Sequence, residues 1–386
     1  MIATGGCGQI YLQTDTPADA TGDGMILAYQ AGAELQDMEF QQFFPTIVYA
    51  PSAFRGSDEG GGEFRYGLHP KFFNSEGEEF MERYEPLAKS WGLRDPTSRA
   101  IYLENKYGRG SPSGGAYLSA RHIPRNVIQS WIDRWRPRWV PKFKEMGIDV
   151  FQDGVEVGPG CHYSCGGIRV NENCESSLPR LYAAGEVASG MDGAERIDGG
   201  PAITWTQVMG YVVEKEVAKK IKDTDFLAID QNQVKEETAK LETLWKRKEG
   251  TRGFAVKNKI KQIMWDQVAL VRNEKGLEEA LKTIQQINAE DIANLSVPGP
   301  SKAFNLGWRE ALEASNMTAI CEMVTKSALM RRESRKSHYR EDYPTQDDAH
   351  WIKNIIIKKK DGQMQFSTAT PIITKIKPPA AKGGER

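Results

Sequence analysis

The segment that decides the fold of this chain is His162–Gly210, which reads HYSCGGIRVNENCESSLPRLYAAGEVASGMDGAERIDGGPAITWTQVMG. A histidine precedes a Gly-Gly turn, and a short apolar strand then ends in Ala-Ala-Gly-Glu. A glycine-rich loop with one arginine follows, and an apolar run typical of a helix completes the segment. This order of strand, loop and helix is the one needed to hold a dinucleotide, and the histidine and the arginine are close enough to share a ligand.

The bulk composition excludes several classes of protein. The 386 residues are enough for two or three domains with a sizeable core. Lysine and arginine total 51 against 52 for aspartate and glutamate, so the charge balance gives no case for nucleic acid as a partner. The sequence has no run of about 18 apolar residues, so no direct membrane span is expected. It also lacks the pattern of a secretion signal.

The cysteine pattern favours reduced thiols in a cytoplasmic protein. The cysteines are odd in number and lack paired CxxC spacing: Cys7, Cys161, Cys165, Cys174 and Cys321. Cys161 and Cys165 flank His162, which raises the alternative of a metal site. No second pair of ligands accompanies them, so the expectation is that the chain holds no metal.

The first residues, MIATGGCGQIY, are typical of a strand that enters a glycine turn. Gly5, Gly6 and Gly8 do not form the GxGxxG fingerprint, and no other segment places that fingerprint after a predicted strand. The chain therefore looks truncated, with the later half of a nucleotide-binding domain and not the first. Asp23 begins the next predicted helix, where it either caps the helix or accepts hydrogen bonds from a cofactor.

Composition and loop signals predict an α/β fold with five parts. Residues 1–45 and 159–225 are expected to form a partial Rossmann-like domain. Residues 46–158, rich in glycine, aromatic and charged residues, are expected to form an inserted α+β domain. Helical spacing of apolar residues predicts a helical bundle domain over 226–340, with helices near 227–250, 258–287 and 306–332. Residues 341–386 are expected to form a tail with a β-hairpin that turns at Asp361-Gly362.

A basic and aromatic stretch at residues 125–147 is typical of a helix broken at Pro137 and Pro141. Its mixture of arginine and tryptophan is also found in proteins that bind nucleic acid. We expect instead that Trp131 and Trp135 pack into a core while the arginines face solvent.

Motifs in a fixed order cover nearly the whole chain: ATGG at 3–6, TGDG at 21–24, GEEFMERY at 77–84, LRD at 93–95, HYSCGGI at 162–168, LYAAGEVASGMDGAER at 181–196, MWDQVALVRNEKGLEEAL at 264–281 and ESRKSHYREDYPTQDDAHWIKN at 333–354. In this order they resemble the flavoprotein subunits of succinate dehydrogenase and fumarate reductase, with L-aspartate oxidase as a near relative. The resemblance implies that the Rossmann-like part is an FAD-binding domain and that the inserted part is its capping domain.

The resemblance also implies which residues bind the cofactor, FAD. Asp23 and Glu186 look like the carboxylates that hydrogen-bond it, and the RIDGGPAI loop stands where the family usually has RLGSNSL. Backbone N–H groups of that loop can still approach the flavin without the serine and asparagine side chains. The implied cofactor-binding residues are Thr4, Gly5, Gly6, Asp23, Glu186, Pro201 and Ala202.

The reaction that the resemblance implies interconverts a saturated carboxylic acid and its α,β-unsaturated form. Arg94 matches the proton-transferring arginine of the family, while His162 and Arg196 match residues that bind the substrate carboxylate. Cations that clamp a conjugated carboxylate make the double bond a better electron sink. An acidic relay is expected behind the arginine, and its candidates are Asp95, Glu78 and Glu82.

One departure from the family bears on the substrate. Phe44 stands where the family commonly has a histidine before Pro-Thr-Gly, and the Thr-Glu-Gly segment is not recognisable. A phenyl ring cannot hydrogen-bond a second carboxylate. Arg55, Arg65 and His69 are the candidates for replacing that histidine, with no choice among them. The expected substrate is a monocarboxylate or a bulkier, more apolar acid than succinate or fumarate.

The resemblance implies an iron–sulfur partner subunit, which would also place the chain at the inner face of a membrane. The chain has no cysteine pattern for a cluster of its own. Two alternatives remain open. The chain is an electron-transferring flavoprotein component with a vestigial substrate site, or it is an inactive fragment that lacks half of the FAD site.

Overall fold

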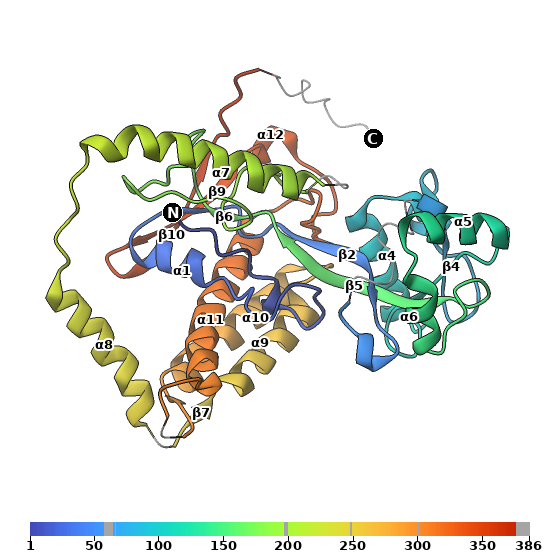
Figure 1. Cartoon of the computed structure of the whole chain (residues 1–386), viewed down its shortest axis with the longest axis horizontal. Helices are drawn as coiled ribbons and strands as arrows, with labels where there is room; N and C mark the ends of the chain where they lie inside the picture. The colour runs from blue at the N-terminus through green and yellow to red at the C-terminus, as the bar shows by residue number, and fades with distance from the viewer. Residues whose placement is uncertain (58–64, 66, 197–199, 248, 300, 376–386) are drawn as a thin grey trace. The chain divides into compact units, whose positions relative to one another are not determined.

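The computed structural model describes residues 1–57, 65, 67–196, 200–247, 249–299 and 301–375 (Figure 1). The chain forms two compact units. Unit 1 comprises Met1–Leu12, Ala18–Gln41 and Tyr163–Arg386, and unit 2 comprises Gln13–Pro17 and Gln42–His162. Each unit is described by itself below.

The sheet of unit 1 has four strands in the order β10-β9-β1-β6, and its neighbours are antiparallel. Its strands are β1 (Leu35–Gln36), β6 (Gly167–Ile168), β9 (Asn354–Lys360) and β10 (Gln363–Ala369). The predicted hairpin is confirmed, because β9 and β10 are joined by Asp361 and Gly362. Both have positive φ, 51° and 75°, as a type I′ turn requires. The hairpin extends the sheet of unit 1 through β9.

The start of the chain lies beside the segment that ends in Ala-Ala-Gly-Glu. Ile2 forms an isolated parallel bridge with Ala183, in which Ile2 N donates to Tyr182 O at 2.8 Å and Ala184 N donates to Ile2 O at 3.0 Å. The helix that follows is α1 (Asp23–Gln30). These contacts bring the Ala-Thr-Gly-Gly turn next to the Ala-Ala-Gly-Glu turn.

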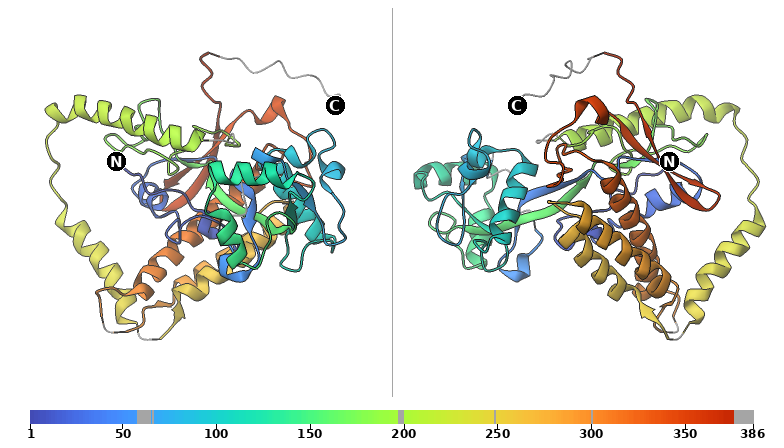
Figure 2. Two further views of the ribbon diagram at one scale, coloured as in Figure 1. Left: turned by 45° about the vertical axis from the view of Figure 1, so that its right-hand side comes forward. Right: turned by 180° about the vertical axis from the view of Figure 1, so that it is seen from behind.

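Three helices of unit 1 form the helical core, and they lie side by side in both views of Figure 2. They are α9 (Gly253–Gln267), α10 (Glu274–Ile287) and α11 (Leu306–Met330). The single helix expected over 258–287 is wrong, because the chain breaks after α9 and the Asn273 side chain caps α10 by accepting from Gly276 N at 2.8 Å. Buried apolar residues recur along one face of α10, as its amphipathic pattern predicts.

The expected helix near 227–250 forms but does not join a bundle core. This helix is α8 (Gln231–Lys246), and it has no buried residue. Asp230 caps it by accepting from Asn232 N at 2.8 Å, so local capping accounts for where the helix begins. The remaining elements of unit 1 are η1 (Gly8–Ile10), α7 (Pro201–Lys220), η5 (Ile221–Asp223), β7 (Thr251–Arg252), η6 (Asn288–Ile292), β8 (Leu295–Ser296) and α12 (Asp348–Trp351).

Unit 2 contains a four-stranded sheet in the order β2-β5-β4-β3. Its strands are β2 (Gln41–Val48), β3 (Lys71–Phe73), β4 (Ala116–Ser119) and β5 (Val155–Ser164). Its helices are η2 (Ser52–Phe54), α3 (Met81–Tyr84), η4 (Lys89–Trp91), α4 (Arg94–Lys106), α5 (Arg125–Trp135) and α6 (Trp139–Glu145). Helices and strands pack around an apolar core that includes Phe72, Ile101, Leu118 and Phe143.

The predicted break near Pro137 is confirmed, but Pro141 breaks nothing. Pro141 lies in the first turn of α6, where a missing N–H costs no helical hydrogen bond. Trp131 packs against the apolar core as expected. Trp135 is 60% exposed, so its predicted burial is wrong. It is the last residue of α5, beyond the buried positions Ile128 and Ile132.

A carboxylate network connects α3 to α4 in unit 2. The Glu104 side chain is 0% exposed and accepts hydrogen bonds from Arg83 at 2.9 Å and from Arg109 at 2.6 Å. Tyr84 Oη also donates to it at 2.6 Å, and Asn74 Nδ2 donates at 3.0 Å. The negative charge is therefore surrounded by donors, which a buried carboxylate requires.

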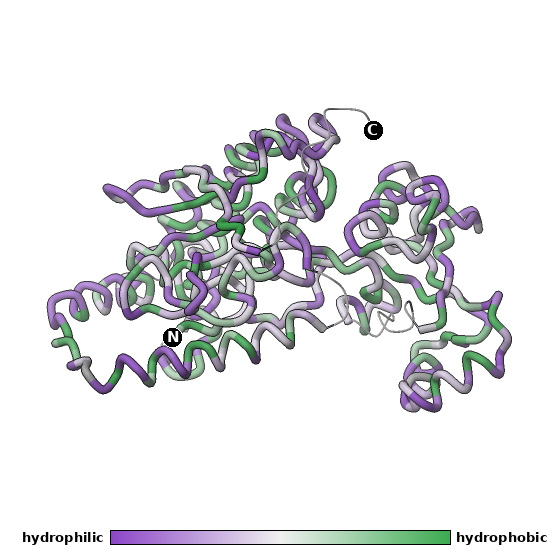
Figure 3. Tube along the Cα trace, turned by 90° about the horizontal axis from the view of Figure 1, so that it is seen from above, coloured by the Kyte–Doolittle hydropathy of each residue, from purple (hydrophilic) through white to green (hydrophobic). Residues whose placement is uncertain are grey.

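Among the described residues, no helix has the length and the apolar character that crossing a membrane would require. Hydrophilic and hydrophobic stretches alternate along the chain in Figure 3.

Candidate functional site

Arg94 is the first residue of α4, and its side chain is largely buried in unit 2. Its Nη1 donates to Gln42 Oε1 at 3.2 Å. Its guanidinium carbon lies 4.8 Å from the centroid of the Phe44 ring, a cation–π distance. Gln42 and Phe44 both belong to β2, so the sheet of unit 2 fixes the arginine at the start of its helix.

His162 lies on β5, and its ring contacts two other residues of unit 2. Its Nδ1 is 2.7 Å from Asp15 Oδ2. The His162 and Phe44 ring centroids are 5.1 Å apart, with a tilt of 31° between the ring planes. The segment that carries Asp15 is fixed to β5, because Cys161 N donates to Gln13 O at 2.9 Å and Thr14 Oγ1 donates to Cys161 O at 2.6 Å.

Phe44 thus contacts two of the three residues that the sequence identified as catalytic. Arg94 and His162 both pack against its ring. Two groups that can carry positive charge therefore share one aromatic residue whose ring offers no hydrogen bond. This arrangement can hold an anionic group and an apolar group of the same small molecule.

Arg196, the third predicted catalytic residue, belongs to unit 1. Its guanidinium carbon lies 4.6 Å from the Tyr163 ring centroid. Burial raises the pKa of Tyr163, and the nearby Asp192 carboxylate raises it further. Burial also raises the pKa of Asp192, although the Tyr163 hydroxyl and the Arg196 charge act in the opposite direction. A clamp formed by Arg196 and His162 together remains a proposal.

The candidates for an acidic relay differ in their surroundings. Asp95 is buried beside Arg94 in the sequence of α4. Glu78 is 3.0 Å from the Arg83 guanidinium and is about half exposed, while Glu82 is 67% exposed and 3.2 Å from Lys89 Nζ. Burial therefore favours Asp95 over the two glutamates.

The three candidates for replacing the family histidine all have other partners. Arg65 is buried and donates to Gly92 O and, at 2.8 Å, to Thr97 Oγ1. Arg55 donates to a backbone carbonyl at 3.2 Å. His69 stacks on a tryptophan ring with 3.4 Å between centroids. None of these contacts involves the Phe44 ring. They therefore give no support to Arg55, Arg65 or His69 as the replacement for the family histidine.

Glycines in unit 1 provide the close approach that a dinucleotide needs. Gly5 has a φ of 76° and open space where a side chain would be. A Cβ at Gly6 would collide with the Glu186 carboxylate, which accepts from Ser164 N at 2.9 Å. Ser164 Oγ in turn accepts from Cys7 N at 3.0 Å. The first glycine turn and Glu186 are therefore held together through Ser164.

The expectation that Asp23 caps the helix is wrong, because the N-cap of α1 is Gly22 and no side-chain cap hydrogen bond forms. Asp23 Oδ2 accepts from Thr21 Oγ1 at 2.9 Å, and its Oδ1 accepts from Asn316 Nδ2 at 2.6 Å. Each carboxylate oxygen has a second lone pair, so a cofactor contact is compatible with these bonds. Thr4 lies next to this helix, because a Cβ at Gly24 would collide with Thr4 Oγ1.

Pro201 and Ala202 begin the 20-residue helix α7, which Gly200 precedes with a φ of 93°. Ala202 packs against a small apolar cluster that contains Phe40 and Tyr163. Residues 197–199 of the RIDGGPAI loop lie outside the described residues. The helix start, the glycine turn and the Glu186 carboxylate are a donor and acceptor set that fits FAD.

The sequence reasoning missed two residues that contact the predicted ones. Gln42 accepts from Arg94, and Asp15 contacts His162. Asp15 lies in a Thr-Asp-Thr stretch that matches none of the family motifs. Only the pairing of its segment with β5 reveals the contact.

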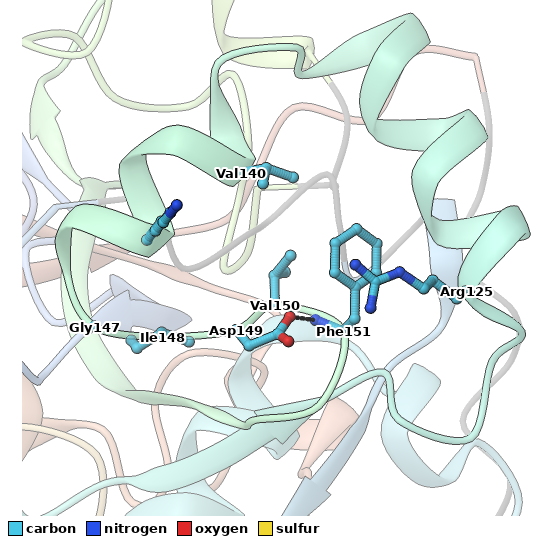
Figure 4. Close-up of a pocket in the computed structure, with 8 residues that line it drawn as sticks. Arg125, Val140, Gly147, Ile148, Asp149, Val150 and Phe151 are labelled. Carbon is cyan, nitrogen blue, oxygen red and sulfur yellow. Dashed lines mark hydrogen bonds between the residues drawn. The ribbon is translucent and has the colours of Figure 1, made fainter.

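A separate hollow of about 420 Å³ opens beside α6 and the start of α5 in unit 2 (Figure 4). Its lining residues are Arg125, Val140, Lys144, Gly147, Ile148, Asp149, Val150 and Phe151. The Arg125 guanidinium stacks over the Phe151 ring, 4.1 Å from its centroid. None of the predicted site residues lines this hollow, so it is not the site of the predicted chemistry.

Two family models match the chain. Residues 1–201 match the model described as FAD binding domain, and residues 257–383 match the model described as fumarate reductase flavoprotein C-term. Together these ranges include every site residue that the sequence predicted except Ala202, which follows the first range directly.

Individual relatives match along most of the chain. An uncharacterized FAD-dependent oxidoreductase of Methanocaldococcus jannaschii is 38% identical over 93% of this chain. A fumarate reductase (CoM/CoB) polypeptide of Methanothermobacter marburgensis is 36% identical over 93% of it. The chain spans 63% of the length of each of these relatives.

A solved structure has the same fold. Mycobacterium smegmatis Sdh1 in complex with UQ1 superposes with a TM-score of 0.81 at 33% identity. The superposition covers 96% of this chain and 61% of that one.

Proposed function

Because the chain belongs to the succinate dehydrogenase and fumarate reductase flavoprotein family, we propose that it interconverts a saturated carboxylic acid and its α,β-unsaturated form. The family membership, the α/β fold class and the FAD cofactor predicted from the sequence are confirmed by the comparisons. The observation that carries the proposed reaction is the packing of Arg94 and His162 on one ring, that of Phe44.

Arg94 is proposed to transfer the proton. FAD, when bound, supplies the hydride chemistry at its N5 atom for one carbon of the substrate double bond. The protein must therefore deliver a proton to the other carbon of that bond. Arginine has a pKa of about 12 or higher and is a poor acid in water. The Arg94 side chain is largely buried and packs against the Phe44 ring, so its guanidinium is held away from bulk water. Asp95 is the candidate for the acidic relay that returns a proton to Arg94.

His162 and Arg196 are proposed to bind the substrate carboxylate. An arginine can bind a carboxylate with two parallel hydrogen bonds, and a histidine adds a third donor. Positive charge at the carboxylate stabilises the negative charge that develops on the conjugated system during hydride transfer.

The presence of Phe44 favours a substrate that has a single carboxylate or an apolar end. The relatives are named for fumarate or succinate, which have a carboxylate at each end. The Phe44 ring cannot donate to a second carboxylate, and Arg55, Arg65 and His69 are engaged elsewhere. An alkyl or aryl enoate would place its apolar end against this ring.

The electron partner is proposed to be an iron–sulfur subunit, as in the respiratory members of the family. Such a subunit would also bring the chain to the inner face of a membrane. Copurification from the native organism, followed by analysis for iron and acid-labile sulfide, tests this partner. A flavin-containing complex without iron would contradict it.

The proposed reaction is tested by anaerobic reoxidation of the reduced flavin. The protein is loaded with FAD, reduced, and mixed with fumarate, crotonate or cinnamate. We expect crotonate or cinnamate to reoxidise the flavin faster than fumarate does. Failure of all three acids would contradict the reaction. Efficient turnover of fumarate would contradict only the substrate class.

Replacing Phe44 by histidine should restore preference for a dicarboxylate. A hydrogen bond to a charged group contributes about 1.5–3 kcal/mol, so the KM for fumarate should fall about tenfold or more. The KM for crotonate should change less, because crotonate has no second carboxylate. Phe44→Leu is the matched control, since leucine is apolar and cannot donate. Equal effects of Phe44→His and Phe44→Leu on the KM for fumarate would count against this role of position 44.

A further inference from the structure

The Asp15 carboxylate has an unusual environment for a charged group. Its side chain is 6% exposed, against 26% for its partner His162. Its Oδ2 is 2.7 Å from His162 Nδ1. Its Oδ1 is buried and has no hydrogen-bond partner among the residues that the structure describes. The carboxylate is therefore held by its contact with the histidine and is otherwise poorly satisfied.

A buried carboxylate accepts hydrogen bonds and cannot donate one while it is ionised. The short contact therefore requires a proton on His162 Nδ1, which either the Nδ1–H tautomer or the imidazolium provides. In both states Nδ1–H donates to the Asp15 carboxylate. Nε2 is then the ring nitrogen left to contact a ligand.

The position of Asp15 is built into the backbone. Thr14 Oγ1 donates to the backbone carbonyl of Cys161, and Thr16 N donates to Thr14 Oγ1 at 3.1 Å. The first bond fixes Thr14 to β5, and the second holds Thr16 against Thr14. The carboxylate is thus held on one side of the His162 ring, while Phe44 packs against the same ring.

We propose that Asp15 is a positioning residue, which keeps a proton on His162 Nδ1 and so orients Nε2 for an anionic group of the substrate. Arg94, which packs on the same Phe44 ring, adds a cation to this environment. The proposal rests on the proposed function only for the identity of the anion as an enoate carboxylate. The proton on Nδ1 is a property of the chain alone.

Nitrogen-15 histidine spectra of the full chain test the proton position without any turnover. The chain has five histidines, and His162→Gln assigns the signal of interest. We expect Nδ1 of His162 to carry a proton in the wild-type protein. We expect Asp15→Asn to shift the tautomer equilibrium toward Nε2–H, because the negative charge is lost while the shape is kept. Asp19→Asn is the matched control, because it removes the charge of an exposed aspartate four positions away.

Titration with crotonate tests the ligand. We expect the His162 signal of the wild-type protein to move on binding, and Asp15→Asn to weaken the affinity about tenfold, which is about 1.4 kcal/mol. A wild-type His162 with its proton on Nε2 alone would overturn the proposal, and this result requires no folded variant. An unchanged affinity for crotonate in a folded Asp15→Asn protein would overturn it as well. Crotonate that binds but fails to reoxidise reduced flavin would count against the proposed reaction and support the role of Asp15.

Discussion

Substitution of Arg94 by glutamine should lower the rate of enoate reduction by about a hundredfold to ten-thousandfold, the range for loss of a general acid. Glutamine keeps a polar N–H donor at position 94 but lacks the cationic N–H that would transfer a proton to carbon. It also loses the charge that packs over the Phe44 ring. Lysine should rescue poorly, because an ammonium group lacks the planar fork of the guanidinium.

The measurement is single-turnover reoxidation of the reduced flavin by crotonate. Arg125→Gln is the matched control, because it also removes an arginine of unit 2 that stacks on a phenylalanine, and that arginine lies at the separate hollow. The control should retain wild-type rates. An Arg94→Gln protein that crotonate reoxidises as fast as it does the control would contradict the role of Arg94 as the proton donor.

Substitution of Glu104 by glutamine should destabilise unit 2 by at least about 2 kcal/mol in free energy of unfolding. The carboxylate is 0% exposed, and its removal leaves Arg83 and Arg109 without their shared counter-charge. Both arginines are partly exposed, so solvent screens part of the loss and the effect should be smaller than for a fully buried pair. Urea unfolding followed by tryptophan fluorescence measures it.

Glu82→Gln is the control for the Glu104 prediction, because Glu82 is 67% exposed and pairs with Lys89. Loss of a surface ion pair should cost less than about 1 kcal/mol. Equal destabilisation by the two variants would contradict a special role for the buried network.

The pH dependence of unfolding provides a further test of Glu104. Burial alone would raise the pKa of its carboxyl, but hydrogen bonds from Arg109, Tyr84 and Asn74 outweigh burial and lower the pKa from 4.5 to about 2. A depressed pKa means that the ionised group stabilises the folded state above about pH 4.5. The stabilisation is lost as the pH falls from 4.5 toward 2. The difference between wild type and Glu104→Gln should therefore shrink over that interval.

Local signals in the sequence are enough to predict several parts of the molecule. The Asp361-Gly362 hairpin can be predicted because both residues tolerate the positive φ of a type I′ turn. The family can be recognised because its motifs are contiguous, so their residues can be numbered without a structure. Because the motifs are contiguous, Arg94, His162 and Arg196 can also be proposed as catalytic residues from the sequence.

Other parts depend on contacts between distant segments. Asp15 and His162 are 147 positions apart, and nothing in the Thr-Asp-Thr stretch indicates which strand it will pair with. The Trp135 side chain suits an apolar core, and α8 was expected to join a helical bundle, yet neither is buried in a core. Periodicity shows which face of a helix is apolar, but it does not show where a packing partner is present.

The sheet of unit 1 has a consequence for the order in which the chain can fold. β1 pairs with β9 through Leu35 and Ile357, and the Asp37 carboxylate accepts a hydrogen bond from Ile355 N at 3.0 Å. β1 also pairs with β6, but a ribosome must synthesise more than 300 further residues after β1 before this strand meets its other neighbour, β9. Until then the edge of β1 that faces β9 stays open, and contacts of such long sequence separation form slowly. Release of the C-terminal hairpin from the ribosome is thus the step at which this sheet can first close, and a chaperone that shields β1 until that moment should raise the yield of folded protein.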